Sequence, residues 1–408
     1  MKLCVISHKR HWLREDKPVS SGGFVLEIDY WATMFDSVLL CVPLHKDEQP
    51  PKGAYGYRAP NVEIAPLPPF KANLPKRFVW RFRKSYRFLM NVVRFFKMLR
   101  AIRACDAVCV RCPGRASMTG LIAAILAGRR RCVRYGANWF PEEDESPSEA
   151  RQKALLRGKL FKGPVLVHWY PDERLGVNVV PIFGSTITKA DVEETRELAI
   201  ARQLSSRPKL IFVGRLSKEK NVDVILEGIA ALKSAVDSAG SELSFDICGD
   251  GDQRKFLEER ATSLGLGSIV TFQGMIPHTA LGENYKTADI LLLASSTEGW
   301  PKVLIEAMLY GLPCIGTSVG SVPHIIGRNG ERGMLWPVGR PELLAEAIAK
   351  LPGDRDLYKS MSRAARAWAE TRTLERYRDE VRAVLEKAWR CELRRADVPP
   401  IASSCSER

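Results

Sequence analysis

The chain has no long uninterrupted apolar stretch. No run of about 18 apolar residues, the length that a membrane-spanning helix needs, occurs in the sequence. Residues 1–10 carry polar and charged side chains where a signal peptide requires an apolar segment. We therefore expect a cytoplasmic protein that has no obvious export signal, does not cross a membrane as a helix, and could associate only peripherally with the inner membrane face.

A secreted disulfide framework is also lacking, although the chain contains ten cysteines. Buried free thiols in a reducing compartment explain their placement more simply. Cys105, Cys109 and Cys112 have the spacing of a radical iron–sulfur motif, but Cys109 lies inside a strand pattern, so we expect no cluster. Six cysteines each lie in or beside a short apolar run: Cys4, Cys41, Cys109, Cys132, Cys248 and Cys314.

Acidic residues are fewer than basic ones. The 62 lysines and arginines exceed the 47 aspartates and glutamates, which gives a formal net charge of +15. Such an excess favours a polyanionic partner, either nucleic acid, an acidic membrane surface or a phosphorylated substrate, and charge alone does not choose among them.

Short β-branched runs alternate with longer helical patterns through both halves of the chain. This alternation predicts an α/β fold with two doubly wound parallel sheets. No glycine triplet follows the first strand, which argues against a nicotinamide oxidoreductase. The predicted strands cover residues 3–6, 38–42, 107–110, 132–135 and 165–168 in the first half and 209–213, 244–248, 269–272, 290–293 and 313–316 in the second.

The 408 residues are too many for one ordinary core, so two main domains are expected. The segment after Val180 lacks a strong strand pattern and ends in Leu-Ser-Ser-Arg-Pro, which indicates an interdomain connection. The predicted division is an N-terminal domain 1–205, a C-terminal domain 206–373, a helix 374–392 that packs back on the N-terminal domain, and a mobile tail 393–408.

One candidate anion site follows the strand 209–213. The strand ends at Gly214, which allows close approach of backbone to a ligand, and Arg215 and Lys220 follow in the loop. Two cations at this spacing can converge on a diphosphate. A charged loop whose cations are merely solvated is an equally simple interpretation of the spacing alone.

A second element follows the strand 290–293. Pro301 is predicted as the first helical residue, so the amides of Lys302 and Val303 would offer a second anion site. Glu306, over one turn into the helix, could hold a ribose diol, and Glu298 could hold sugar hydroxyls. Without context, two exposed carboxylates would be the simpler interpretation.

These segments together resemble glycosyltransferase family 4. The resemblance is strong over about residues 210–338 and weakens elsewhere. It implies the GT-B fold, in which two doubly wound Rossmann-like domains face a cleft. The matching segments are Gly214-Arg215-Leu216, Lys220-Asn221, Gly249-Asp250-Gly251, Gly274, the stretch from Glu298 to Glu306 with Ala307-Met308, and Gly311-Leu312-Pro313.

The resemblance implies a nucleoside-diphosphate sugar bound in the C-terminal domain. Arg215, Lys220 and Glu298 would be catalytic, with the two cations on the diphosphate. The family transfers sugars with retention of configuration by front-face attack, and it implies no metal or other cofactor. The implied donor-binding set is Gly214, the backbone of Met275 and Ile276 at the base, Gly299, Trp300, Pro301, Lys302 and Val303, and Glu306 at the ribose.

Two segments need separate comment, one because it imitates a metal-binding pattern and one because it differs from the family's usual residue. Asp250-Gly251-Asp252 imitates a metal-binding pattern but occupies the family's glycine turn, so we expect no metal requirement. The family usually has Phe, Leu or another residue where Trp300 stands, so this position is expected to shape sugar choice.

In the N-terminal half, Gly22 and Gly23 resemble the glycine pair that opens the family's first long helix beside the cleft. They could let backbone amides approach phosphate or acceptor, or they could simply form the loop that leads into the helix. Asn138 follows the fourth strand, where relatives often carry His or Asp, which leaves an acid or base at that position in doubt.

The segment 76–103 has basic and aromatic residues and no acid. One interpretation is a core-packed helix with a solvated basic face. The other is a monotopic patch on an anionic membrane, since Lys, Arg and aromatic side chains together favour the interface.

The leading hypothesis is a retaining hexosyltransferase that uses a nucleotide-sugar donor and a glycan or lipid-linked acceptor. We expect no nucleic-acid partner. A nucleotide-sugar epimerase of the same fold, or a non-catalytic basic binding protein, are the alternatives. The sugar, the nucleotide base and the acceptor stay open.

Overall fold

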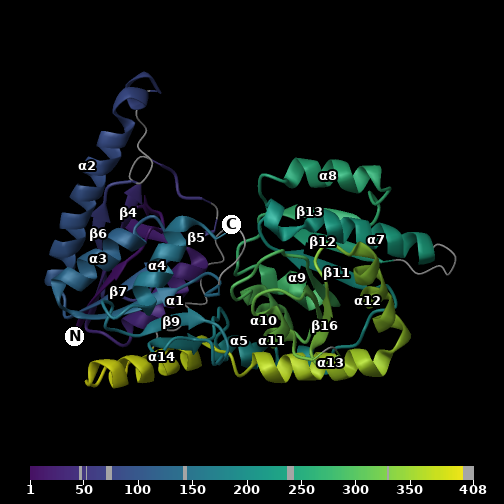
Figure 1. The fold of residues 1–408 in the computed structure, drawn as a ribbon. Helices are drawn as coiled ribbons and strands as arrows, with labels where there is room; N and C mark the ends of the chain where they lie inside the picture. Colours follow the sequence, from purple (N-terminus) through teal and green to yellow (C-terminus); the bar gives the residue numbers. More distant parts are fainter. Residues whose placement is uncertain are drawn as a thin grey trace. The chain divides into compact units, whose positions relative to one another are not determined.

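A computed structural model describes residues 1–45, 48–51, 53–69, 76–140, 145–236, 243–328 and 330–397. The chain divides into two compact units, Met1–Ile182 with Arg378–Arg408 (unit 1) and Phe183–Tyr377 (unit 2). In each unit, helices cover both faces of a mostly parallel sheet (Figure 1). The prediction of an α/β fold with two doubly wound sheets is therefore confirmed.

The sheet of unit 1 is built around β1 (Lys2–Ile6), which lies between β4 (Ser37–His45) and β7 (Ala107–Cys112). All three strands are parallel. The sheet continues from β7 through β8 (Arg130–Tyr135) and β9 (Val165–His168) to β10 (Val179–Ile182), and β6 (Val62–Leu67) pairs with β4 on the other side. A small ribbon of β2 (His11–Arg14), β3 (Lys17–Ser21) and β5 (Ala54–Gly56) extends from β4.

The helices of unit 1 are α1 (Gly22–Ala32), α2 (Lys76–Arg103), α3 (Ser117–Ala127), α4 (Pro147–Arg157) and most of α14 (Leu374–Trp389). Large side chains such as those of Trp31 and Trp139 are fully buried in this unit. No helix of the described ranges is both long and apolar enough to span a bilayer.

Unit 2 contains six parallel strands. They are β11 (Lys209–Val213), β12 (Ser244–Cys248), β13 (Val270–Gly274), β14 (Ile290–Leu293), β15 (Cys314–Thr317) and β16 (Gly333–Trp336), in the order β13-β12-β11-β14-β15-β16. The strand order therefore reverses between β11 and β14. In open α/β sheets, ligands bind outside the carboxyl ends of the strands at such a switch point.

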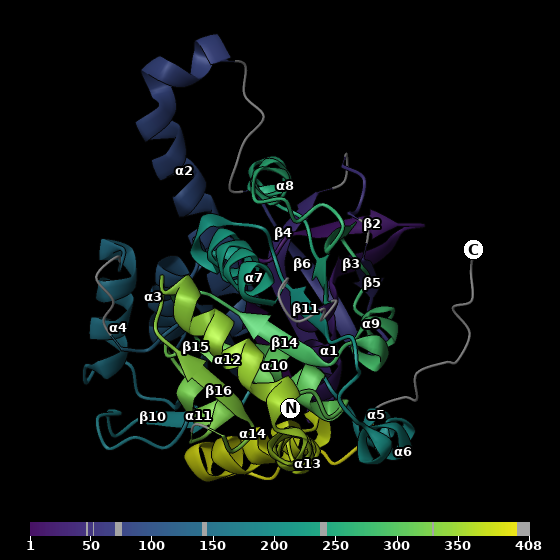
Figure 2. The ribbon, with the colours of Figure 1, turned by 90° about the vertical axis from the view of Figure 1, so that its right-hand side faces the viewer.

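Helices pack on both faces of this sheet. On one face, α7 (Val222–Val236) lies beside α12 (Pro341–Gly353) (Figure 2). Their apolar sides fill the core with buried residues such as Ile229 and Leu344, which lie in one cluster with Phe212 of β11. The remaining helices are α5 (Lys189–Glu194), α6 (Arg196–Ala201), the short 3-10 helix η1 (Lys218–Lys220), α8 (Arg254–Ser263), α9 (Leu281–Thr287), α10 (Lys302–Leu309), α11 (Val322–Ile326) and α13 (Arg355–Ala369).

All ten predicted strands are present, and four of them, β9, β11, β12 and β14, have the predicted bounds. The sequence misses β2, β3, β5, β6, β10 and β16. These strands are short or contain proline and charged residues, as in Lys17–Ser21 and Val62–Leu67, so they lack a continuous apolar run.

The two units divide at Ile182, earlier than the boundary that the sequence places at 205. Segment 183–203 belongs to unit 2 because arginines bind it there. The Arg202 guanidinium donates to the carbonyls of Tyr285 and Lys286 at 3.0 and 3.1 Å. Arg366 donates to the Thr195 hydroxyl at 2.6 Å.

The C-terminal helix α14 ends against unit 1. The Trp389 indole donates to the Arg131 carbonyl at 3.3 Å, and its ring lies 6.4 Å from that of Phe35. Of the predicted mobile tail 393–408, residues 398–408 lie outside the described residues.

Two loops of unit 2 touch through their backbones beside β11. The amide of Leu216 donates to the Asp250 carbonyl, and the amide of Gln253 donates to the Leu216 carbonyl, both at 3.0 Å. A Cβ atom on Gly251 would lie 2.1 Å from the Leu216 oxygen. Glycine is therefore required at 251 by backbone contact within the fold.

We expect Gly251→Ala to lower the free energy of unfolding by about 2 kcal/mol or more, because the added methyl group overlaps the Leu216 carbonyl. Urea unfolding followed by circular dichroism measures the change. The matched control is Gly267→Ala, where a Cβ atom meets nothing within 4 Å and a change within about 0.5 kcal/mol is expected. Equal stability of the two variants would contradict the contact.

Candidate functional site

The loops that follow β11 and β14 form a single structure at the carboxyl edge of the unit 2 sheet. Asn221 adopts a left-handed conformation with φ of 46°, and its side-chain amide donates to the Ala294 carbonyl at 3.1 Å. The Ser296 amide donates to the Glu219 carbonyl at 2.9 Å. These bonds fix the position of Lys220, between Glu219 and Asn221, against the loop that contains Glu298.

Lys220 and Glu298 form an ion pair in which the Lys220 ammonium lies 2.6 Å from Glu298 Oε1. The Ser295 hydroxyl donates to the same oxygen at 2.8 Å. The side chains of Lys220 and Glu298 are 23% and 11% exposed, so both stay reachable from solvent. The structure thus brings together two of the three residues predicted to be catalytic.

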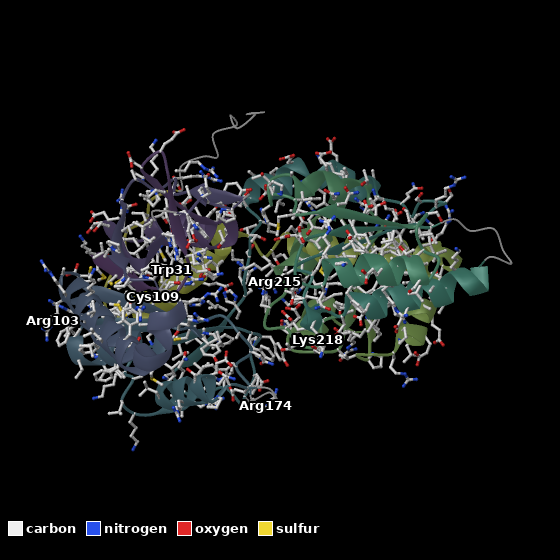
Figure 3. The ribbon with its side chains drawn as sticks, turned by 90° about the horizontal axis from the view of Figure 1, so that it is seen from above. Trp31, Arg103, Cys109, Arg174, Arg215 and Lys218 are labelled. Atoms are coloured by element: carbon white, nitrogen blue, oxygen red, sulfur yellow. The ribbon has the colours of Figure 1, made fainter. Side chains whose placement is uncertain are left out.

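Arg215, the third of these residues, is exposed on the same loop, and its carbonyl accepts from the Ser217 amide at 3.1 Å. Its guanidinium makes no hydrogen bond or ion pair with the described residues. Figure 3 labels it together with Lys218 of η1. The pKa of Glu219 is lowered, first by the Ser217 hydroxyl and further by the charges of Arg215 and Lys220. Gly214 directly follows β11 and begins this loop.

Helix α10 begins one residue later than predicted, at Lys302, and Pro301 is its cap. Pro301 has φ of −73° and ψ of 98°, so its ψ is extended instead of helical. An α-helix leaves its first amides without intrahelical partners, and the amides of Lys302 and Val303 lie in this first turn. The predicted positive helix end therefore lies beside the loop of Glu298.

The end of β15 and the loop after it bind the backbone on both sides of Glu298, a support that the sequence does not predict. The Thr317 hydroxyl donates to the Ser295 carbonyl at 2.7 Å, and the Ser321 hydroxyl donates to the Gly299 carbonyl at 2.6 Å. A Cβ atom on Gly320 would lie 1.8 Å from the Glu298 carbonyl oxygen. In the sequence, this support is indicated only by the small residues at the end of β15 and in the loop after it.

The Trp300 side chain is 9% exposed, and its indole donates to the Gly184 carbonyl at 2.9 Å. Its ring also lies 6.4 Å from His324. The side chain thus ties the loop 298–301 to the segment that begins unit 2. That this position shapes sugar choice stays a prediction.

Glu306 is buried, and both of its carboxylate oxygens accept hydrogen bonds. Oε1 accepts from the Thr186 hydroxyl and from His278 Nε2, the latter at 3.1 Å, and Oε2 accepts from the Tyr285 hydroxyl at 3.1 Å. These three partners cannot be predicted from the sequence, because they come from the start of unit 2, the turn after β13 and α9.

Burial by itself raises the pKa of Glu306, but the charge of His278 and hydrogen bonds from His278, Thr186 and Tyr285 outweigh it and lower the pKa to about 2. In return, the charge of Glu306 raises the pKa of His278. Burial raises the pKa of Tyr285, and the charge of Glu306 raises it further. Glu306 is therefore an ionised hydrogen-bond acceptor at neutral pH.

The other predicted donor residues follow β13. Met275 is 58% exposed and Ile276 is half-buried, just after Gly274, whose φ is +71°. Their backbone lies at the carboxyl edge of the same sheet, two strands from β11.

Three predicted residues belong to unit 1. Gly22 is the first residue of α1, and a Cβ atom there would lie 2.8 Å from the Tyr55 ring, whereas Gly23 has open space beside it. The Asn138 side-chain oxygen accepts from the Phe140 amide at 3.1 Å, so it stabilises the turn after β8.

No group of three or more side chains in the described part of the chain could hold a metal ion. The Asp250 carboxylate instead accepts from the Gly251 amide at 2.7 Å and pairs with Arg254. The nine cysteines of the described ranges are free thiols, and eight of them are buried, including Cys105, Cys109 and Cys112.

We expect the His278–Glu306 pair to make stability depend on pH. A raised histidine pKa contributes stability below the unfolded value of 6.5, and this contribution is lost as pH rises through the folded pKa. The difference in free energy of unfolding between the wild type and His278→Gln should therefore be larger at about pH 5.5 than at about pH 8.5. Urea titrations at both pH values measure it. A difference that does not change with pH would refute the pair.

Comparison with known proteins matches part of unit 2 to a family. Residues 195–368 match the family described as Glycosyl transferases group 1. The chain is 28% identical over 237 residues to the alpha-D-kanosaminyltransferase of Streptomyces kanamyceticus, which covers 58% of this chain and 56% of that protein. It is 31% identical over 157 residues to the N-acetyl-alpha-D-glucosaminyl L-malate synthase of Bacillus anthracis. The aligned residues are 38% of this chain and 39% of that protein. The chain thus spans only 56% and 39% of the lengths of these two relatives.

Two solved structures resemble the whole chain at low identity. Anabaena HepE in complex with UDP has a TM-score of 0.68 at 18% identity and covers 95% of this chain and 100% of that one. The lipopolysaccharide outer core galactosyltransferase WaaB, in its apo form, has a TM-score of 0.60 at 15% identity and covers 95% and 99%. Residues 195–368 are therefore a Glycosyl transferases group 1 domain, carried by a chain whose two Rossmann-like sheets have the GT-B fold.

Proposed function

We propose that the protein is a retaining glycosyltransferase of family 4 that moves a hexosyl group from a nucleoside-diphosphate sugar to a lipid-linked or polysaccharide acceptor in cell-surface glycan biosynthesis. The observation that carries this proposal is the Lys220–Glu298 pair at the switch point of a group 1 domain. An ammonium and a carboxylate at this position suit the two halves of a sugar nucleotide, one anionic and one rich in hydroxyls.

The diphosphate would lie against the loop after β11 and the first turn of α10. Arg215 and Lys220 supply positive charge from the loop, and the first amides of α10 add the positive end of its dipole. The related fold of HepE, solved with UDP and with UDP-glucose, supports a nucleotide sugar as donor.

In the proposed reaction, the bond between the sugar's anomeric carbon and the β-phosphate oxygen breaks, and its electron pair goes to that oxygen. The acceptor hydroxyl attacks from the same face, which retains the configuration, and a phosphate oxygen takes its proton. Lys220 and Arg215 stabilise the developing charge, and one such preorganised donor contributes about 2.7–4 kcal/mol. No protein base is then required.

The two carboxylates would hold hydroxyl groups. Glu298 orients the Lys220 ammonium through Oε1 and presents its other oxygen to the transferred sugar. Glu306 accepts one bond at Oε2, from Tyr285, so this oxygen retains a lone pair for a ribose hydroxyl. Its low pKa keeps it an acceptor at neutral pH.

We expect Lys220→Ala to lower turnover by about 100-fold or more, because it removes the positive charge that stabilises the departing diphosphate. The donor is first identified by thermal shift against uridine, guanosine and adenosine diphosphate sugars, since a ligand at 100 times its Kd stabilises by about 2.7 kcal/mol. Release of nucleoside diphosphate then measures turnover.

The matched control is Lys218→Ala, which removes the same charge from an exposed position two residues away in η1. It should stay within about threefold of the wild type, as expected for a surface change. Circular dichroism verifies that both variants fold. Unaltered turnover in folded Lys220→Ala would remove the basis of the proposal, and product formation from donor alone would indicate an epimerase instead.

We further propose that α2 docks on an anionic membrane. Met98 and Ile102 are buried in the core, whereas Phe88, Leu89 and Phe96 are 72%, 58% and 62% exposed. Exposed aromatic residues with adjacent cations are typical of a helix that lies in a membrane interface. Lys97, Arg100 and Arg103 are the exposed cations of this part of the helix.

The helix also reaches beyond its sheet, as Figures 1 and 2 both show. Each cation near an anionic leaflet contributes about 1 kcal/mol. The predicted basic and aromatic side chains of 76–85 and 87 lie outside the described residues.

We expect the double variant Phe88→Ser with Phe96→Ser to lower binding to vesicles that contain phosphatidylglycerol by about tenfold, because each exposed phenyl group loses its insertion energy. Vesicle flotation measures the bound fraction. Phe256→Ser, at a 49% exposed phenylalanine on α8, is the matched control and should bind as the wild type does. Equal flotation with phosphatidylcholine alone would contradict docking on an anionic membrane.

A further inference from the structure

The sheet of unit 1 has its own switch point. Strand β1 lies between β4 and β7, and the chain passes from β1 toward one side of the sheet and returns at β7 on the other. The loops after β1 and β7 therefore meet at the carboxyl edge, where open α/β sheets bind ligands. Helix α3 also begins at this edge, directly after the β7 loop.

His8, two residues after β1, packs tightly on the β7 loop. A Cβ atom on Gly114 would lie 2.0 Å from His8 Nδ1, so only glycine allows this contact. Nδ1 is buried and has no hydrogen-bond partner among the residues that the structure describes. The ring as a whole is half-buried, which leaves Nε2 as the ring nitrogen that can donate to a ligand.

Three cations lie close enough to the His8 imidazole to act on it electrostatically. Burial lowers the pKa of His8, and the charges of Lys9, Arg111 and Arg115 lower it further. Arg115 is exposed and has no hydrogen-bond or ion-pair partner within the described ranges. The adjacent cations would stabilise a bound anion, and the uncharged imidazole could donate a hydrogen bond to it.

Two acids of unit 1 already accept hydrogen bonds from other groups. Glu27 of α1 accepts from Arg111 at 2.8 Å and from Arg134 at 3.0 Å, so one carboxylate serves two guanidinium groups. Asp29 accepts from the Arg58 and Ala59 amides, and burial raises its pKa to about 6. These two carboxylates therefore have hydrogen-bond partners other than His8 and Arg115.

We propose that unit 1 binds an oxyanion between the loops that follow β1 and β7, with His8 Nε2 and the Arg115 guanidinium as hydrogen-bond donors. The inference rests on the proposed function and specifies it: the acceptor carries a phosphate or a carboxylate. Lys9 and Arg111 supply charge around the site, and the α3 N-terminus adds the positive end of a helix dipole.

The test uses the full chain with inorganic phosphate and with acetate as probes. Side-chain NMR resolves the signals of the six histidines. Addition of phosphate or acetate should shift the His8 signals and raise its pKa, because a bound anion offsets the adjacent cations. The anion that binds more tightly identifies the group on the acceptor.

Arg115→Gln should weaken this binding by about tenfold, as expected for a hydrogen bond to a charged group. His8→Gln provides a second variant. The matched control, Arg130→Gln, removes an exposed cation at the amino end of β8, the opposite edge of the sheet, and should bind as the wild type does. Unchanged His8 signals, or equal binding by Arg115→Gln and Arg130→Gln, would overturn the inference.

The outcome is independent of the donor site. Stabilisation by nucleotide sugars reports on unit 2 and should be the same in Arg115→Gln and the wild type. If phosphate binds at His8 but no nucleotide sugar binds, the site in unit 1 stands while the proposed transferase function fails. If nucleotide sugars bind and His8 does not respond, only the anionic acceptor is refuted.

Discussion

The parallel pairing of β11 with β14 brings together two loops whose key residues lie 78 positions apart in the sequence. Because the strand order reverses at this pair, no other strand lies between the loops, and helices leave the sheet on opposite faces. Everything in the candidate site depends on this geometry. The left-handed Asn221, the Lys220–Glu298 pair and the first turn of α10 all meet at this edge.

Backbone contacts make the edge rigid. Gly251 and Gly320 each lie so close to a carbonyl oxygen of a neighbouring loop that a methyl group would overlap it. The hydroxyls of Thr317 and Ser321 bond to the backbone on either side of Glu298. A site that holds a diphosphate by fixed charges needs such rigidity, since preorganised donors stabilise a developing charge without reorganising.

The buried charges of the two units serve different ends. In unit 2, Glu306 is ionised and accepts one hydrogen bond at Oε2, which suits a group that holds a ligand hydroxyl. In unit 1, the single carboxylate of Glu27 pairs with two guanidinium groups, those of Arg111 and Arg134. One glutamate thus pairs with two arginines in unit 1, whereas Glu298 pairs with one lysine in unit 2.

The sequence alone determined ten strands of the two sheets, the loop cations and the carboxylates at Glu298 and Glu306, because continuous apolar runs and glycine-ended strands are local signals. It could not show that His278, Tyr285 and Thr186 surround Glu306, or that His8 packs on Gly114, because those contacts join segments with no common pattern. It also placed the end of the first domain after segment 183–203, which arginines from α13 and the linker tie into unit 2. Tertiary structure decided these points because long-range hydrogen bonds leave no periodicity in the chain.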